Sequence, residues 1–302
     1  MRILVVGAGS TGGYFGGRLA QAGRDVTFLV RPTRAESLRQ NGLQIVSPHG
    51  DLTLMPKMAT AGQIPSSYDV VLLAVKAFAI DAAIEDLAPA VGAETMILPV
   101  LNGMRHVDTL TSRFGGAALV GCACKIASMV DSQGRIVQLT PLHDIVYGEM
   151  DGSASVRTDR LNAEMRGAGF GARLSRTIAR DMWEKWILLA TVGGINCLMR
   201  GNIGQVQAAA DGPAFMARFL DEVTAVVKAV GVAPSEAFLT GAAASLQEPG
   251  STMTTSMYRD LQRGGRIEAE QIIGDLVMRA QRAQIDIPLL LAVNAHLSVY
   301  QA

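Results

Sequence analysis

The sequence has few cysteines, no net charge and no long apolar run. Its three cysteines form neither a C-x-x-C pair nor a spaced metal-binding set, and an odd number is a poor disulfide framework. Lys and Arg together number 27, as do Asp and Glu, so no net field draws the chain to nucleic acid or an anionic membrane. The longest uncharged helical run, residues 186–199, is shorter than the roughly 18 residues that span a bilayer. We therefore expect a cytoplasmic globular protein that has neither nucleic acid nor membrane as a partner.

Small aliphatic residues and glycine make up much of what the sequence does contain. Hydrophobic residues account for 49% of the chain, aromatic residues for only 5%, and there are 32 glycines, which is typical of α/β enzymes. A length of 302 residues suits two domains. The four histidines are scattered without metal-ligand spacing, so we expect no metal site.

Short β-rich runs alternate with helical segments through the first half. This alternation predicts βαβ units that feed a parallel sheet, as in a Rossmann-like domain. The runs are Ile3–Val6, Val26–Val30, Val70–Val75 and Met96–Leu101. A hairpin is predicted from Leu43–Val46 and Leu52–Leu54. Two further strands, Gly134–Leu139 and Ile145–Tyr147, are expected to run antiparallel and give this α/β domain a mixed sheet edge.

From about Thr177 onward the strand signal fades. Long stretches of helical periodicity replace it, at Asp181–Leu198, Pro213–Val230, Ile267–Ala283 and Pro288–Tyr300. We therefore expect a nucleotide-binding Rossmann-like domain over residues 1–176 and an all-helical substrate and catalytic domain over residues 177–302.

A glycine-rich loop follows the first predicted strand and opens a helix. Its sequence, Gly7-Ala8-Gly9-Ser10-Thr11-Gly12, has the G-x-G-x-x-G spacing that permits a tight turn and lets backbone N–H groups approach a pyrophosphate. The N-terminus of the helix stabilises the negative charge of that group. Glycines at 13, 16 and 17 allow the helix to pack closely. The pattern predicts a dinucleotide site.

The end of the second predicted strand indicates which dinucleotide binds. Domains that prefer NAD usually carry Asp or Glu there, which binds the ribose 2′-hydroxyl. This chain has Arg31 and Arg34 instead and no carboxylate. Guanidinium groups suit a 2′-phosphate through forked, charge-assisted hydrogen bonds. The predicted cofactor is therefore NADPH, with ordinary surface charges as the alternative role of the two arginines.

Two polar residues directly follow predicted strands. Lys76 follows the run that ends at Val75, and Asn102 follows the run that ends at Leu101. Open α/β sheets bind ligands at the carboxyl ends of parallel strands. Both side chains are therefore candidates for cofactor contacts, although residues at strand ends also serve as caps and turn formers.

The second half contains three candidates for chemistry. Lys185 lies beside two tryptophans at the start of an apolar helix, where a partly desolvated ammonium donates a proton readily to a carbonyl oxygen. The alternative is a lysine that extends from a core helix into solvent. Glu268 and Glu270 are equal candidates by spacing, beside the apolar stripe of their helix. Ser256 is a candidate carboxylate ligand or a helix N-cap.

These residues resemble the ketopantoate reductases, also called 2-dehydropantoate 2-reductases, over nearly the whole chain. The shared motifs are the glycine loop, V-K-A at 75–77, N-G-M at 102–104, W-x-K at 183–185, S-M at 256–257 and a Glu and Gly at 268 and 274. The resemblance implies that Lys185 is the general acid and that Glu268 holds cofactor or substrate. It also implies that Ser256 binds substrate, and that Lys76, Asn102 and Ala127 line the NADPH site, with Asn102 also close to the substrate.

Three positions depart from the family pattern. Where the family has asparagines that bind the polar groups of the substrate, this chain has Leu189, Gly193 and Ile203. A substrate hydroxyl without such a partner would be desolvated at a cost of roughly 1 to 3 kcal/mol. Asn196, three turns after Lys185, and Asn202 are candidates to replace the missing amides, and Arg259 is a candidate ligand for the acid group.

The resemblance implies NADPH-dependent reduction of a 2-oxo acid to a 2-hydroxy acid, with ketopantoate and pantoate as the first candidate pair. One alternative is a family member that reduces a less polar 2-oxo acid. Another is a non-catalytic NADPH-binding protein, against which the retention of Lys185 and Glu268 argues. The sequence leaves the oligomeric state open, with a homodimer as the candidate.

Overall fold

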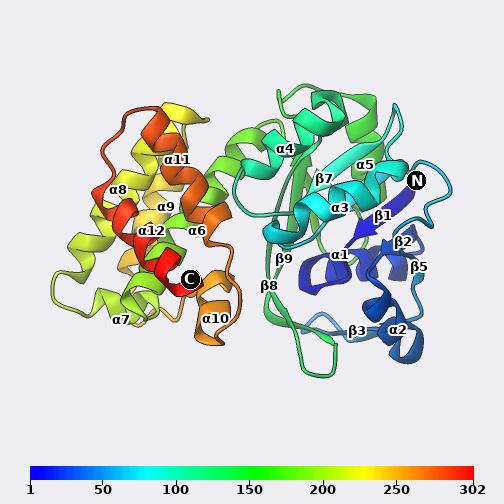
Figure 1. Ribbon diagram of the computed structural model, residues 1–302, viewed down its shortest axis with the longest axis horizontal. Helices are drawn as coiled ribbons and strands as arrows, with labels where there is room; N and C mark the ends of the chain where they lie inside the picture. Colours follow the sequence, from blue (N-terminus) through cyan, green and yellow to red (C-terminus); the bar gives the residue numbers. More distant parts are fainter. The chain divides into compact units, whose positions relative to one another are not determined.

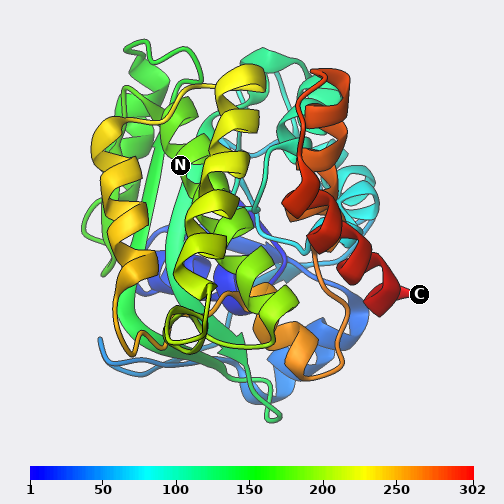
Figure 2. The same ribbon diagram turned by 90° about the vertical axis from the view of Figure 1, so that its left-hand side faces the viewer.

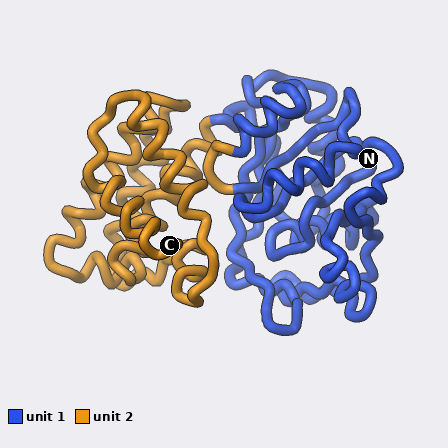
Figure 3. The backbone as a smooth tube through the Cα atoms, in the orientation of Figure 1, with its two compact units in different colours: residues 1–101, 106–179 blue, residues 102–105, 180–302 orange.

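The computed structural model describes all 302 residues, which form two compact units. Unit 1 contains residues 1–101 and 106–179, and unit 2 contains residues 102–105 and 180–302 (Figure 3). Residues 102–105, which we expected in the first domain, group with the helical one. No helix has both the length and the apolar character needed to cross a membrane.

The first sheet of unit 1 is parallel throughout (Figure 1). Its strands lie in the order β5 (Lys57–Ala59), β2 (Asp25–Leu29), β1 (Arg2–Val6), β6 (Val70–Leu73) and β7 (Met96–Pro99). The four apolar runs in the sequence are thus confirmed as strands, because strands covered on both faces are apolar throughout. All five strands end at the same edge of the sheet, where such sheets bind ligands.

A second sheet carries the mixed strands of unit 1. It contains β10 (Gly171–Leu174), β9 (Ile136–Gly148), β3 (Leu43–Val46) and β4 (Leu52–Leu54), with β8 (Gly121–Val130) paired to β9. The β3–β4 hairpin is confirmed. The two antiparallel strands expected at 134–139 and 145–147 are one strand, β9, so their division was wrong. This strand pairs antiparallel with β8, which supplies backbone partners along both of its ends. The mixed strands form a sheet of their own, and only one parallel bridge, between Ile97 and Leu119, joins it to the β7 edge.

Helix α1 (Ser10–Gln21) packs against both sheets, and its glycines make this possible. A Cβ on Gly16 would lie 2.7 Å from the Phe28 ring of β2, and a Cβ on Gly17 would lie 2.8 Å from Ile45 of β3. Gly13 likewise lies against β9. The expectation that these glycines allow close helix packing is confirmed. Because α1 begins at the glycine loop, this packing also fixes the position of the loop.

The other helices of unit 1 are α2 (Pro32–Asn41), α3 (Ile80–Leu87), α4 (Arg105–Phe114) and α5 (Val156–Met165), with short 3₁₀ turns η1 (Ala77–Ala79), η2 (Ala88–Ala90) and η3 (Gly116–Ala118). All three cysteines are buried, and none forms a disulfide bond.

Unit 2 is entirely helical, as predicted. Its elements are α6 (Ile178–Met199), α7 (Ile203–Gln207), α8 (Gly212–Val230), α9 (Glu236–Gln247), α10 (Ser256–Gln262), a π-helical turn η4 (Glu270–Gly274), α11 (Asp275–Arg282) and α12 (Pro288–Gln301). Helix α8 packs beside α9, as Figure 2 shows, and also contacts α11 and α12. The sequence did not predict α7, α9 and α10, which are short or carry only a weak apolar stripe.

Candidate active site

The glycine loop has the geometry of a dinucleotide cradle. Gly7 has a φ of +95°, and a Cβ there would lie 2.8 Å from the Ala74 carbonyl oxygen, so only glycine fits. A Cβ on Gly12 would overlap the Gly7 carbonyl. Around Gly9, the N-cap residue of α1, a Cβ would meet no atom within 4 Å. The loop is therefore closed toward the sheet and open at the start of α1, which suits the approach of a pyrophosphate.

The two arginines after β2 occupy different environments. Arg31 is exposed and is the N-cap residue of α2. Arg34 donates from Nε to the Ala8 carbonyl at 3.3 Å and from Nη1 to the Gly134 carbonyl at 3.2 Å, whereas its Nη2 is buried with no partner. Burial lowers the pKa of Arg34. An unpartnered guanidinium nitrogen beside the glycine loop is a donor that a phosphate would satisfy. The residues present therefore fit NADPH.

Two other predicted cofactor residues lie in unit 1. Lys76 is exposed and precedes η1, two residues beyond the Ala74 that packs on the glycine loop. Ala127 lies where the β8–β9 register shifts, between Ile126 and Ser128. Bulges of this kind redirect side chains and are frequent beside active sites. Lys76 and Ala127 stay predicted cofactor contacts.

Lys185 lies on a well-anchored part of α6. The Lys185 side chain is half-buried, and the neighbouring Trp186 is fully buried. The Trp186 indole Nε1–H donates to the Ile272 carbonyl at 2.9 Å. On the other flank, the Glu184 carboxylate accepts hydrogen bonds of 2.8 Å from the backbone and hydroxyl of Ser235. These contacts fix the position and rotation of the helix at Lys185.

The structure distinguishes between the two glutamates that spacing left equal. Glu268 is only 8% exposed. The Glu270 side chain is 75% exposed and pairs with Arg105 at 3.2 Å. Glu268 lies two residues before the π-helical turn η4, and such turns occur often at functional sites. Burial beside this turn favours Glu268 as the functional carboxylate.

Asn102 is held by a residue that the sequence did not single out. Gln271 donates from Nε2 to the Asn102 carbonyl at 2.9 Å. Gly103 follows with a φ of +77°, and a Cβ there would lie 2.6 Å from the Gln271 carbonyl. The Arg105–Glu270 pair adds a further link. These contacts explain why residues 102–105 belong to unit 2, and only the glycine in N-G-M hinted at them.

Ser256 and Arg259 lie on the short helix α10. Thr255 is the N-cap residue and accepts a hydrogen bond from the Tyr258 N–H at 3.4 Å, so Ser256 does not serve as the cap. Arg259 is half-buried, and its Nη1 donates to the carbonyl and hydroxyl of Thr254 at 3.2 and 3.3 Å. Burial lowers the pKa of Arg259. Both remain candidates for the substrate carboxylate.

The two asparagines proposed as replacements are committed to the fold. Asn196 is fully buried; its Nδ2 donates to the Gly201 carbonyl at 2.9 Å, and its Oδ1 accepts from the Thr255 N–H at 3.1 Å. Asn202 forms a capping box with Gln205 at the start of α7. The prediction that Asn196 binds substrate is therefore corrected: its amide fixes the backbone before α10.

The three positions that depart from the family pattern also differ from one another. Ile203 is fully buried, so it is part of the core rather than a wall of the site. A Cβ on Gly193 would lie 3.0 Å from the Met257 methyl group, so that methionine occupies the space beside the glycine. Leu189 is half-buried one turn after Lys185. The face of α6 that continues from Lys185 is consequently apolar.

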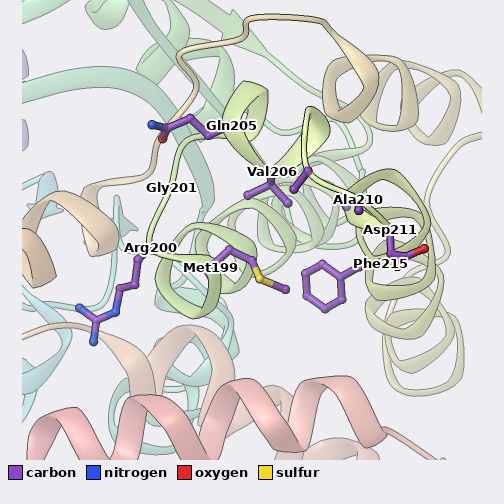
Figure 4. A pocket seen from close by; sticks show the side chains of 10 residues that line it. Met199, Arg200, Gly201, Gln205, Val206, Ala210, Asp211 and Phe215 are labelled. Carbon is purple, nitrogen blue, oxygen red and sulfur yellow. The ribbon is translucent and has the colours of Figure 1, made fainter.

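A cavity of about 430 Å³ opens where α6 ends and α7 and α8 follow. Its walls include Met199, Val206 and Phe215, and the Met199 side chain points toward the Phe215 ring (Figure 4). No predicted site residue lines this cavity, so it is separate from the candidate active site.

Comparisons with known proteins identify close relatives of the chain. A family model described as ketopantoate reductase PanE/ApbA matches residues 3–152, and the model of its C-terminal part matches residues 177–301. The uncharacterized oxidoreductase YkpB of Bacillus subtilis (strain 168) is 34% identical over 302 residues, which cover 100% of this chain and 99% of the relative.

Solved structures show the same fold. The crystal structure of 2-dehydropantoate 2-reductase from Geobacter metallireducens GS-15 superposes with a TM-score of 0.88 at 26% identity and covers 99% of both chains. D-mandelate dehydrogenase in a ternary structure with NADH and anilino(oxo)acetate also gives a TM-score of 0.88, covering 99% of this chain and 98% of that one. At 17% identity, the latter likeness concerns the fold alone.

Proposed function

This chain belongs to the ketopantoate reductase family, and we propose that it reduces a 2-oxo acid to a 2-hydroxy acid with NADPH. The observation that supports this most directly is the linkage of the predicted catalytic groups within unit 2. Trp186, beside Lys185, binds the turn that follows Glu268, and the same turn binds the Asn102 carbonyl. Segments far apart in the sequence are thus joined at one turn of unit 2.

The residues of unit 1 suit NADPH binding. The glycine loop and the start of α1 would hold the pyrophosphate, and Arg31 with the Nη2 of Arg34 would hold the 2′-phosphate. These contacts would distinguish NADPH from NADH, because only the former has the 2′-phosphate. NADPH, when bound, supplies the hydride that reduces the carbonyl carbon.

The proton that completes the reduction comes from Lys185 in this proposal. Its ammonium donates a hydrogen bond to the carbonyl oxygen and transfers a proton to that oxygen as the alcohol forms, after which the amine regains a proton from water. Arg259 and Ser256 bind the carboxylate of the substrate. Glu268 accepts hydrogen bonds from substrate or cofactor.

Ketopantoate is the first candidate substrate, because the family models describe that reductase. A less polar 2-oxo acid is the second candidate, and it is favoured by the apolar face of α6. Leu189 follows Lys185 there, Met257 fills the space beside Gly193, and the Asn196 amide is committed to backbone groups. A terminal hydroxyl on the substrate would find no amide partner on this face.

A panel of 2-oxo acids tests the proposal. Purified protein is mixed with NADPH and ketopantoate, its deoxy analogue or branched apolar 2-oxo acids, and the loss of NADPH absorbance is followed. Matched ketones that lack the carboxylate serve as controls. We expect turnover of at least one 2-oxo acid and little turnover of the ketones. NADPH binding without turnover of any acid would favour the non-catalytic alternative.

A further inference from the structure

We propose that Gln271 is a positioning residue that fixes Asn102 in its cofactor-binding orientation. The inference rests on the proposed function, in which Asn102 contacts NADPH. Gln271 itself is only 7% exposed, and its amide reaches the backbone rather than the side chain of Asn102. It therefore acts through the shape of the turn.

The Asn102–Gly103 turn has little freedom to move while Gln271 is in place. The 2.9 Å hydrogen bond from the Gln271 amide holds the carbonyl between Asn102 and Gly103. Gly103 then turns through a φ of +77° directly against the Gln271 backbone, with no room for a Cβ. Met104 beyond it is buried. The Asn102–Gly103 peptide is therefore held at its oxygen by Gln271 and packed against the Gln271 backbone through Gly103. We infer that this restraint fixes the direction of the Asn102 side chain.

The π-helical turn that contains Gln271 also contacts the helix of the proton donor. A π-turn inserts one extra residue and shifts backbone carbonyls out of the α-helical register. In η4, the Ile272 carbonyl accepts the Trp186 indole N–H at 2.9 Å, and Trp186 directly follows Lys185. Gln271 and Ile272, adjacent in the chain, thus tie Asn102 and Lys185 to the same turn. This linkage would keep the cofactor-binding amide and the proton donor in a fixed mutual arrangement.

A double-mutant cycle separates positioning from general support of the fold. Gln271→Met retains the length of the side chain and removes its hydrogen-bond donor, whereas Asn102→Ala removes the oriented amide and keeps the backbone carbonyl that Gln271 holds. The dissociation constant for NADPH is measured by calorimetry in the parent, both single variants and the double variant. Gln281→Met, the same change on the exposed surface of α11, is the matched control.

In the parent, we expect Gln271→Met to raise the NADPH dissociation constant about fivefold, the effect of one net hydrogen bond. In the Asn102→Ala background the same change should alter it by less than about twofold, because the group being positioned is gone. Gln281→Met should have no effect in either background. The proposal would be overturned if Gln271→Met raised the NADPH dissociation constant by the same factor in both backgrounds, or left it unchanged in the parent.

Two further measurements keep the test decisive. If Gln271→Met does not fold, Gln271→Glu retains the shape but places an acceptor against the Asn102 carbonyl, and the same cycle applies. The deuterium isotope effect with reduced cofactor labelled at the transferred position should rise in the Gln271 variant, because misalignment slows hydride transfer selectively. The binding cycle needs no substrate. Intact NADPH binding without turnover of any 2-oxo acid would therefore contradict the proposed function alone.

Discussion

Replacing Arg31 and Arg34 separately should distinguish selection of the cofactor from support of the glycine loop. Arg31 is exposed at the N-cap of α2, so Arg31→Ala should change the free energy of unfolding by less than about 0.5 kcal/mol. Loss of its charge-assisted contact with the 2′-phosphate should weaken NADPH binding by about 1.5 kcal/mol, roughly tenfold. NADH binding should change little, because NADH has only a neutral 2′-hydroxyl in place of the phosphate.

Arg34→Ala should have a broader effect. Arg34 makes two hydrogen bonds to backbone carbonyls from a half-buried position, and each contributes about 0.5 to 1.5 kcal/mol, so the variant should be destabilised by roughly 1 to 2 kcal/mol. One of these bonds holds Ala8 in the loop that both cofactors would use. Affinity for NADH should therefore fall together with affinity for NADPH, and NADPH should lose more because Nη2 is lost as well.

Calorimetric titration with each cofactor, together with thermal unfolding, measures these effects. Arg39→Ala is the matched control, since Arg39 lies on the same helix with a side chain that is 59% exposed and pairs with Glu36. It should alter neither cofactor affinity nor stability appreciably. If Arg31→Ala weakens NADH and NADPH binding equally, Arg31 does not contact the 2′-phosphate and the reasoning fails.

The apolar face of α6 and a stacked histidine pair give two further predictions. The kcat/KM values for ketopantoate and for an analogue without its terminal hydroxyl should lie within about tenfold of each other. Leu189→Asn should raise the preference for ketopantoate. A preference of several thousandfold for ketopantoate in the parent would contradict this prediction. His143 stacks on His49 with ring centroids 3.7 Å apart and shares a 2.7 Å hydrogen bond with the Tyr14 hydroxyl, and burial, followed by the charge of His49, lowers its pKa below 6.5. The unfolded chain then binds the proton more readily than the folded one, so Tm should decline as the pH falls below about 6.5. His143→Phe should make this decline of Tm with pH less steep. An unchanged dependence of Tm on pH would exclude His143 as its source.

Local patterns predicted the parts of the fold that local forces determine. The parallel strands could be predicted because both faces of the sheet are covered and their residues are therefore apolar. The glycine loop could be recognised in the sequence because nearby atoms leave no room for a Cβ at Gly7 and Gly12. The continuity of β9 was missed for the opposite reason. Its polar middle segment, around Pro141, resembles a turn, and only pairing of its two ends with β8 makes it one strand.

The site was predictable only where motif and geometry coincide. Lys185 and Glu268 were predicted from their helical setting and the family resemblance, and burial then favoured Glu268 over Glu270. Gln271 had no local signal, because its partner lies 169 residues away in the chain. Asn196 was wrongly predicted to bind substrate. Helical spacing places it on the same face as Lys185, but it cannot reveal that the Asn196 amide already forms hydrogen bonds with backbone groups.

Turnover by Lys185→Ala tests the central claim most directly. The variant is compared with the parent on the most active 2-oxo acid of the panel, with NADPH affinity measured by calorimetry on the same preparations. Loss of a positioned general acid should lower kcat by about 10² to 10⁴. NADPH affinity should remain within about twofold of the parent, because the glycine loop and arginines lie in the other unit. Turnover within a few-fold of the parent, with cofactor affinity unchanged, would contradict the assignment of Lys185 as the proton donor.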